Sequence, residues 1–420
     1  MRILYTFAIF IYQEIIRVAA LFDGKARLWL HGRKNLLHRL TLKIEHENQS
    51  GRPVIWFHCS SLGEFEQGRP VIEKIKTLFP RYRILLTFFS PSGYEIRKGY
   101  DQADWVFYLP LDTPGNVRKF IHAVNPAVAF FVKYDYWFNF LNELKSRQIP
   151  VLMISAVFRP SQYFFHWYGV WFRKQLEAIT WFFVQYEDSL ALLKSIGKDN
   201  VSTTGDTRFD RVADIASGNV EFPLIKDFCG NSNVMITGST WREDENILIP
   251  FISGESHGMK FIIAPHDISP GRIREIGNRL EKPFIKYSEL TSGNSKSADI
   301  LILDTIGILA RLYRYATIAY IGGGFGVGIH NIQEPITFGV PVLFGPNYKR
   351  FREAVDLVSL GAAFSVRSTA GLIQPVSLLL SDQEYRSKIS AICSSYVDKH
   401  KGATEKIIQG IINFGLLAAK

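Results

Sequence analysis

The residues best placed for chemistry lie in segment 321–346, which joins two apolar stretches through a glycine cluster. The glycines are Gly322, Gly323, Gly324, Gly326 and Gly328. A glycine turn lets the backbone come close to a ligand, and a helix that begins just beyond it offers free N–H groups to a phosphate. Asn331 and Glu334 follow, and a carboxylate in that first turn can accept hydrogen bonds from a sugar hydroxyl. The pattern indicates a nucleotide-sugar site.

The same segment also fits a purely structural arrangement. Asn331 and Glu334 have the spacing of a capping box, and the glycines can serve a tight turn alone. Two other nucleotide-binding motifs are missing from the sequence. No G-x-G-x-x-G follows an expected strand, and no G-x-x-x-x-G-K-[ST] occurs. Their absence disfavours a dinucleotide oxidoreductase and a P-loop NTPase.

A second candidate lies in the first half, where the apolar stretch Val54–Cys59 is followed by Ser61–Glu64. Gly63 is expected to permit a tight turn, which would place Glu64 at the start of a helix. The positive end of a helix dipole keeps a carboxylate ionised, so this side chain could act as a general base toward an alcohol. The alternative is an ordinary first-turn glutamate without a function.

Cations and hydroxyl groups follow other apolar stretches. They are Arg208, the pair Ser239 and Thr240, and His266, with Arg272 beyond it. Each could cap a helix, but together at consecutive strand ends they suit a nucleotide phosphate.

Short apolar stretches alternate with amphipathic ones from Pro53 onward, which is typical of a parallel sheet covered on both faces. The first series of expected strands is Val54–Cys59, Ile84–Phe89, Trp105–Leu109, Val128–Val132, Val151–Ser155 and Ile179–Gln185. The second series is Val234–Gly238, Phe261–Ala264, Ile300–Asp304, Thr317–Ile321 and Val340–Phe344. The expected fold class is α/β, with two Rossmann-like doubly wound domains facing a cleft and ligands beyond the carboxyl ends of the strands.

The expected domain boundaries follow breaks in this rhythm. Residues 1–45 would form a membrane-associated helix and a basic segment, and 46–210 the first Rossmann-like domain. Residues 211–232 would be a linker, and 233–420 the second domain with terminal helices over 382–415.

Composition narrows the choice of partners. The 420 residues carry a net charge of +10, which favours anionic partners. They include 32 Phe, which indicates either much buried aromatic surface or contact with lipid. The three cysteines are scattered, so a disulfide framework or a zinc site is not expected. A run of Lys and Arg interleaved with aromatic residues is missing from the body of the chain, which disfavours nucleic acid.

The N-terminus carries the membrane signal. Ile3–Tyr12 is nearly all apolar, but polar residues interrupt it before it reaches the length of about 20 residues that a bilayer span needs. Lys25–Lys43 then holds six cations and no acid. An apolar helix beside such a segment predicts attachment to the cytoplasmic face of an anionic membrane, lying on it or spanning it. The alternative is a buried helix followed by a solvated basic loop.

These motifs together resemble the 3-deoxy-D-manno-octulosonic acid (Kdo) transferases, membrane-associated enzymes of lipopolysaccharide assembly with the GT-B fold. The matching segments are Ser61–Glu64, Ser90–Gly93, Tyr108–Asp112, Gly205–Asp210, Gly238–Glu245, Ala264–His266, Leu303–Leu309 and Gly322–Glu334. Each motif is weak alone, but eight in the family's order are specific.

The resemblance implies an inverting glycosyltransferase that moves Kdo from CMP-Kdo to a lipid A precursor (lipid IVA), with no metal or other cofactor, at the cytoplasmic side of the cell inner membrane. Glu64 would be the base that deprotonates the acceptor hydroxyl. The CMP-Kdo donor would be held by Ser239, Thr240, His266, Gly324, Gly326, Asn331 and Glu334. Further candidates for phosphate or acceptor contacts are Ser61, Gly63, Arg208, Arg272 and Lys349.

The sequence departs from the family pattern in three places. Where many members carry E-T-E-x-W-P-N, this chain has Lys133 and Asp135 at the acidic positions, and Asp135 is assigned the remaining catalytic function. The proline of N-P-x-E has moved to Pro335. The arginine before His266 is missing, and Arg272 or Lys349 is expected to supply its charge.

Two alternatives stay open. One is another GT-B glycosyltransferase or an epimerase that uses a UDP-linked sugar. The other is a non-catalytic membrane-bound scaffold that has kept the fold.

Overall fold

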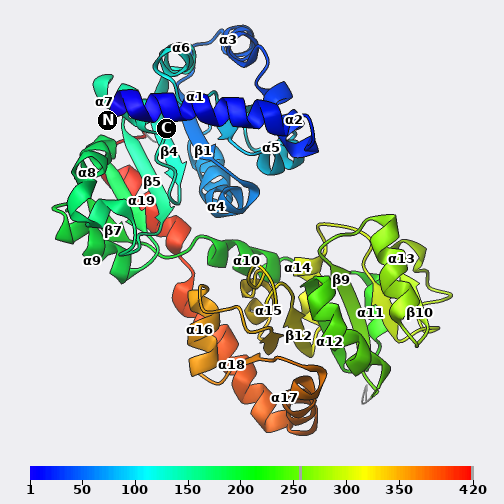
Figure 1. Cartoon of the computed structure of the whole chain (residues 1–420). Helices are drawn as coiled ribbons and strands as arrows, with labels where there is room; N and C mark the ends of the chain where they lie inside the picture. Colours follow the sequence, from blue (N-terminus) through cyan, green and yellow to red (C-terminus); the bar gives the residue numbers. More distant parts are fainter. Residues whose placement is uncertain (255–257, 418–420) are drawn as a thin grey trace. The chain divides into compact units, whose positions relative to one another are not determined.

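The computed structural model describes residues 1–254 and 258–417, which form two compact units (Figure 1). The first unit contains residues 1–210 together with the chain from Lys401 on, and the second contains residues 211–400. Each unit is built around one parallel sheet.

The sheet of the first unit has the strand order β3-β2-β1-β4-β5-β6-β7, with every pair parallel. Its strands are β1 (Val54–Cys59), β2 (Arg83–Phe88), β3 (Trp105–Tyr108), β4 (Pro126–Val132), β5 (Val151–Ala156), β6 (Trp181–Val184) and β7 (Val201–Thr203). The apolar runs form buried strands because helices cover both faces of the sheet. The six strands expected in this half are all confirmed, with ends that differ by a few residues.

The helices of the first unit lie on two sides of that sheet, each with its own hydrophobic cluster. They are α1 (Arg2–Ala19), α2 (Gly24–Gly32), α3 (Leu36–Glu47), α4 (Leu62–Leu78), α5 (Pro91–Arg97), α6 (Pro114–Val124), α7 (Phe138–Ser146), α8 (Val170–Gln175), α9 (Glu187–Ser195) and α19 (Ala403–Asn413). Helix α10 (Arg208–Ser217) begins in the first unit and continues into the second.

The second unit repeats the architecture with the strand order β10-β11-β9-β8-β12-β13-β14. Its strands are β8 (Val234–Thr240), β9 (Lys260–Pro265), β10 (Phe284–Lys286), β11 (Ile300–Ile302), β12 (Ile318–Ile321), β13 (Val342–Phe344) and β14 (Ala363–Ser365). Its helices are α11 (Pro223–Cys229), α12 (Arg242–Ser253), α13 (Pro270–Arg279), α14 (Leu309–Leu312), α15 (Gln333–Thr337), α16 (Arg352–Ser359), α17 (Thr369–Ser381) and α18 (Gln383–His400). Two doubly wound α/β units are therefore confirmed.

Two of the expected boundaries are wrong. Residues 211–232 are not a linker, because α10 and α11 occupy much of this stretch and Ile225 and Phe228 are fully buried in the second unit. The last helix, α19, does not belong to the second domain. Its residues Ile407, Ile408 and Ile411 join the hydrophobic cluster of the first unit.

Both candidate sites occupy the same topological position. In the first sheet the strand order reverses between β1 and β4, whose carboxyl ends lead to Glu64 and Asp135. In the second sheet it reverses between β8 and β12, which lead to Trp241 and the glycine segment. Such reversal points are where open α/β sheets bind ligands.

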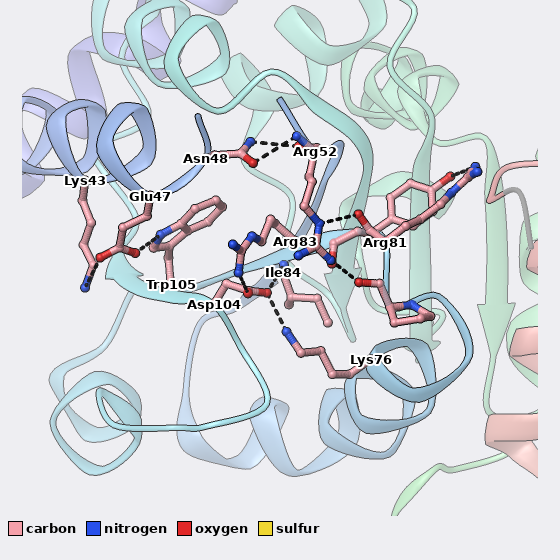
Figure 2. A network of polar contacts seen from close by, with 12 residues as sticks. Lys43, Glu47, Asn48, Arg52, Lys76, Arg81, Arg83, Ile84, Asp104 and Trp105 are labelled. Carbon is pink, nitrogen blue, oxygen red and sulfur yellow. Dashed lines mark hydrogen bonds and ion pairs between the residues drawn. The ribbon is translucent and has the colours of Figure 1, made fainter. Parts of the chain in front are cut away.

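The opposite, amino ends of β2 and β3 carry a structural polar network (Figure 2). Asp104 accepts hydrogen bonds from Lys76 Nζ at 2.8 Å, Arg83 Nη1 at 2.6 Å and the Ile84 N–H at 2.8 Å. Although burial alone would raise the pKa of Asp104, these donors lower it. Next to it, Trp105 donates from Nε1 to Glu47 Oε2 at 2.7 Å and ties α3 to the sheet.

Helix α1 has an apolar outer face and an anchored inner face. Apolar side chains such as Ile3, Phe7 and Val18 are at least 60% exposed, and α1 contains no buried residue. On the inner face, Tyr5 donates from its hydroxyl to Asp112 Oδ2 at 2.6 Å, and Arg2 donates from Nε to Asn139 Oδ1 at 2.9 Å. Over the described residues, we find no helix that is both long and apolar enough for a membrane span.

Asp112→Ala is expected to lower the free energy of unfolding by about 3 kcal/mol or more, because it leaves three hydrogen-bond donors without their acceptor. The carboxylate accepts from Tyr5 and from the backbone N–H groups of Asn139 and Phe140, and burial raises its pKa to about 6. Urea unfolding at pH 7 measures the change. The exposed Asp101→Ala serves as control and should stay within about 0.5 kcal/mol of wild type. Equal midpoints for the two variants would contradict the anchoring role.

Candidate active site

Glu64 lies in the first turn of α4, where its side chain completes a capping box with Ser61. The Ser61 N–H donates to Glu64 Oε2 at 2.9 Å, and the Glu64 N–H donates to Ser61 Oγ at 3.4 Å. The carboxylate is buried, and burial raises its pKa although the Ser61 amide and Lys133 act in the opposite direction. Glu64 therefore caps the helix. Its raised pKa also makes it a better proton acceptor than an ordinary glutamate, which suits a general base.

Gly63 does not have the role expected for it. Its φ is not in the left-handed region, and a Cβ at this position would meet nothing nearer than Ser61 Oγ at 4.0 Å. The prediction of a tight turn that needs glycine is therefore wrong. Gly63 is exposed and leaves open space beside Glu64 at the helix N-terminus.

Asp135 stands next to Glu64. The Ser60 N–H donates to Asp135 Oδ2 at 3.0 Å, so consecutive backbone amides, those of Ser60 and Ser61, hold the two carboxylates. Burial, and after it the charge of Glu64, keeps the pKa of Asp135 well above its usual range. Each of two close carboxylates makes ionisation of the other less favourable, so the pair retains a proton to higher pH than an isolated carboxylate does.

Lys133 occupies a position where the family carries an acid. Its backbone is left-handed, with φ of 71°, at the end of β4. Burial, followed by the charge of Arg208, lowers its pKa, while Glu64 and Asp206 raise it. Arg208 itself is bound to Asp206 with Nη2 to Oδ2 at 2.6 Å. The cation at 133 stabilises the ionised form of Glu64.

A buried histidine behind the two carboxylates had not been singled out from the sequence. His58 Nε2 accepts from Trp137 Nε1 at 2.9 Å and lies 3.4 Å from Asp135 Oδ2. Its Nδ1 is 2.9 Å from Thr87 Oγ1, which in turn accepts from Trp56 Nε1 at 2.8 Å. Burial lowers the pKa of His58 to about 3, so the ring is neutral and donates from Nδ1. His58 lies within the apolar strand β1, so nothing in the sequence around it indicated a functional residue.

In the second unit, three aromatic rings stack at the carboxyl end of β8. The Trp241 ring centroid lies 4.4 Å from that of His266, and His266 lies 4.8 Å from His330. Trp241 Nε1 donates to His330 Nε2 at 2.9 Å, and burial lowers the pKa of His330 to about 4. The stack therefore joins the glycine segment to β8 and β9. Trp241 and His330 were not on the list of expected donor contacts.

A cavity of about 260 Å³ opens beside this stack, lined in part by Thr240, Trp241, His266 and Arg272. The structure thus brings together three of the residues expected to bind the donor or its phosphate. Arg272 is engaged already, because it pairs with Glu245 and with Glu275, the latter at 2.8 Å. The idea that it replaces the missing arginine is weakened, since two carboxylates neutralise its charge.

Some glycines of this segment permit close backbone packing, and others leave open space beside the backbone. A Cβ at Gly322 would lie 2.3 Å from the Ser239 carbonyl oxygen, and one at Gly324 would lie 2.6 Å from the Gly345 N. At Gly326 the nearest atom would be 4.0 Å away. Gly324 therefore has a structural reason to be glycine, whereas Gly326 leaves open space.

Asn331 and Glu334 lie at the start of the five-residue helix α15, and the alternative of a capping box between them is wrong. The N-cap is Ile332, and Asn331 Oδ1 accepts from the Gln333 N–H at 3.0 Å. Asn331 Nδ2 donates to Glu334 Oε1 at 3.2 Å. The shift of the proline to Pro335 accompanies this different geometry.

Lys349 and Ser239 complete the set of expected contacts. Lys349 is exposed in the turn after β13, where Asn347 Nδ2 donates to the Gly326 carbonyl at 3.0 Å. This turn therefore lies against the glycine segment. Ser239 has a left-handed backbone, with φ of 54°, at the bulge in β8.

Two Rossmann-like units, each with polar side chains at its strand reversal, have the architecture of the GT-B class. The family described as 3-Deoxy-D-manno-octulosonic-acid transferase (kdotransferase) matches residues 34–211. The chain is 26% identical to the 3-deoxy-D-manno-octulosonic acid transferase of Chlamydophila psittaci, over 90% of this chain and 89% of the relative. It is also 26% identical to that of Aquifex aeolicus, over 87% and 97%. The sequence is therefore similar to Kdo transferases over most of its length.

Solved structures agree on the fold. The UDP-GlcNAc 2-epimerase of Neisseria meningitidis superposes with a TM-score of 0.61 at 19% identity, covering 86% of this chain and 99% of that one. At this identity the likeness concerns the fold and not the substrate.

Proposed function

We propose that this chain transfers Kdo from CMP-Kdo to a lipid A precursor, with inversion at the sugar and with Glu64 as the general base. The observation that carries the proposal is the pair of buried carboxylates at the strand reversal of the first sheet. Similarity to the 3-deoxy-D-manno-octulosonic acid transferases supports Kdo as the transferred sugar.

In the proposed reaction, the acceptor hydroxyl lies in the open space beside Gly63. Glu64 takes its proton as the oxygen attacks the anomeric carbon of Kdo, and the bond from that carbon to the CMP phosphate breaks on the opposite face. In this proposal Asp135, whose pKa is raised by burial, carries the proton of the pair. The negative charge then resides on Glu64, whose ionised form is stabilised by the charge of Lys133. No metal or other cofactor enters this scheme, so a chelator should leave the rate unchanged.

The donor nucleotide belongs to the second unit in this proposal. Thr240 and His266 border the cavity, and His266 is supported by the Trp241 ring. The exposed turn that holds Lys349 offers a cation near Gly326 for the leaving phosphate.

Mass spectrometry of the product formed from CMP-Kdo and lipid IVA tests the proposed function. A mass increase of one or more Kdo units supports it. Turnover with UDP-linked sugars and none with CMP-Kdo would favour the alternative of another nucleotide-sugar enzyme. Binding without turnover of either donor would favour a scaffold.

His266→Ala is expected to raise the KM for CMP-Kdo by about 10- to 100-fold, because a hydrogen bond to a charged group contributes about 1.5–3 kcal/mol. Steady-state kinetics with varied donor measures it. The exposed His122→Ala in the first unit is the matched control and should leave KM unchanged. An unaltered KM in His266→Ala would remove this residue from the donor site.

We also propose attachment to the cytoplasmic face of the inner membrane through the outer face of α1. Phe7 and Phe10 are 60% and 48% exposed there. Replacing both with Glu should release the protein from anionic vesicles in a flotation assay, since charged side chains are costly at the interface with hydrocarbon. The control places Glu at the exposed Leu78 and Ile96. Equal flotation of the two double variants would contradict the role of α1.

A further inference from the structure

A hollow of about 1360 Å³ lies among α1, α2 and α3. It is larger than the usual 300–1,000 Å³ of small-molecule sites. Its walls include apolar side chains, among them Leu28, Trp29, Leu30, Leu36 and Leu37, and the turn Pro110–Leu111. No residue of the cluster around Glu64 and Asp135 lines this hollow. It is therefore a separate feature of the first unit.

The lining of the hollow is also strongly basic. The cations that line it are Arg17, Lys25, Arg27, Arg33 and Lys34. The single acidic side chain in its lining is Asp23, whose Oδ1 accepts from the Lys25 N–H at 2.8 Å as the cap of α2. The space thus combines an apolar interior with an excess of positive charge, which fits a ligand with a hydrocarbon part and an anionic head.

A buried guanidinium forms part of the wall. Arg33 donates to the carbonyl oxygens of Phe89 at 2.8 Å and of Leu109 at 3.0 Å, and it lies 3.9 Å from the Trp29 ring centroid. These partners are neutral, so its charge is left for the hollow. Burial lowers the pKa of Arg33 to about 9, which still leaves it charged at neutral pH.

The surface beside the hollow is that of a protein in contact with lipid. Leu21 and Phe22, at the end of α1, are 73% and 85% exposed, and Leu28 on α2 is 45% exposed. Leu28 is also a lining residue of the hollow, so the exposed apolar surface extends to it. Because neither Glu64 nor Asp135 lines the hollow, a lipid bound here is not placed by these residues as an acceptor.

We propose that the hollow among α1, α2 and α3 binds one anionic glycerophospholipid from the bilayer, with its phosphate against the cations and an acyl chain among the leucines. The bound lipid is a structural ligand and not the acceptor. This site does not depend on Kdo transfer, because its test is binding.

Binding of monomeric dioctanoyl phosphatidylglycerol to the purified full-length protein tests the proposal, with native mass spectrometry and fluorescence titration as readouts. We expect at least tenfold tighter binding than for dioctanoyl phosphatidylcholine and for inorganic phosphate. Arg27→Gln with Lys34→Gln should weaken it by about tenfold or more. Both residues are exposed, so the fold should persist, and an unchanged melting temperature checks this. The control double variant, Lys74→Gln with Lys194→Gln, should bind as wild type.

Each other outcome overturns the inference. Equal binding of both phospholipids would indicate unspecific apolar adsorption. Equal binding of inorganic phosphate would indicate a simple anion site, and displacement of the phospholipid by lipid IVA at equal or lower concentration would assign the hollow to the acceptor. Unchanged affinity in the Arg27 and Lys34 variant would place the lipid elsewhere.

Discussion

Glu64→Gln is expected to lower turnover by about 100-fold or more, the usual size of a general-base contribution. The substitution separates the two roles of this residue. Glutamine can still accept the 2.9 Å hydrogen bond from the Ser61 N–H, so the helix cap and the fold are retained. It cannot accept a proton, so only the base is lost. Single-turnover measurements with CMP-Kdo and lipid IVA give the rate, and calorimetry gives donor affinity, which should be unchanged.

The matched control lies two residues further along the same helix. Glu66 is also an acid in α4, but it pairs with Arg97 at 2.7 Å on the partly exposed side. Glu66→Gln should therefore change the rate little. Equal rates for wild type and Glu64→Gln would show that Glu64 is only a cap. Loss of donor binding in Glu64→Gln would show instead that the carboxylate shapes the site before the reaction.

The two α/β units could be predicted from the sequence because buried parallel strands appear as continuous apolar runs. Stretches such as Val54–Cys59 are continuous apolar runs next to glycine and polar residues, and this strand was predicted with its observed ends. The three-residue strands β7, β10 and β14 were missed because they are only partly buried, so their sequences lack a continuous apolar run. The equally short β11 and β13 are fully buried and were predicted. Helix α19 was assigned to the wrong unit because amphipathicity says that a helix packs, but not against which sheet.

The candidate site was only partly visible for a similar reason. Glu64 and His266 follow apolar stretches, and that position alone marks them. His58 lies inside a strand, and its neighbours Trp137 and Thr87 come from distant segments, so the network exists only after folding. Arg272 was correctly placed near His266, but its carboxylate partners could not be read from the sequence.

Two substitutions of Asp135 separate the effect of its hydrogen bond with Ser60 from the effect of its charge. Asp135→Ala is expected to lower turnover by about 10- to 100-fold, since it leaves the Ser60 N–H without its 3.0 Å partner. That amide adjoins the one that holds Glu64, and a base displaced by about 1 Å can cost about 100-fold. Asp135→Asn should instead stay close to wild type, because asparagine imitates the neutral acid and can still accept from Ser60.

The pH dependence of the rate tests the same argument. Because burial raises the pKa of Glu64, the acid limb of the wild-type profile should lie above the ordinary range of a glutamate, with activity rising as pH increases through it. At higher pH, Asp135 loses its proton in wild type, and the second negative charge disturbs the pair. Asp135→Asn has no such second ionisation, so its profile should stay flat on that side. If Asp135→Asn is as slow as Asp135→Ala at every pH, then the reaction needs a negative charge at position 135, and the shared proton is ruled out.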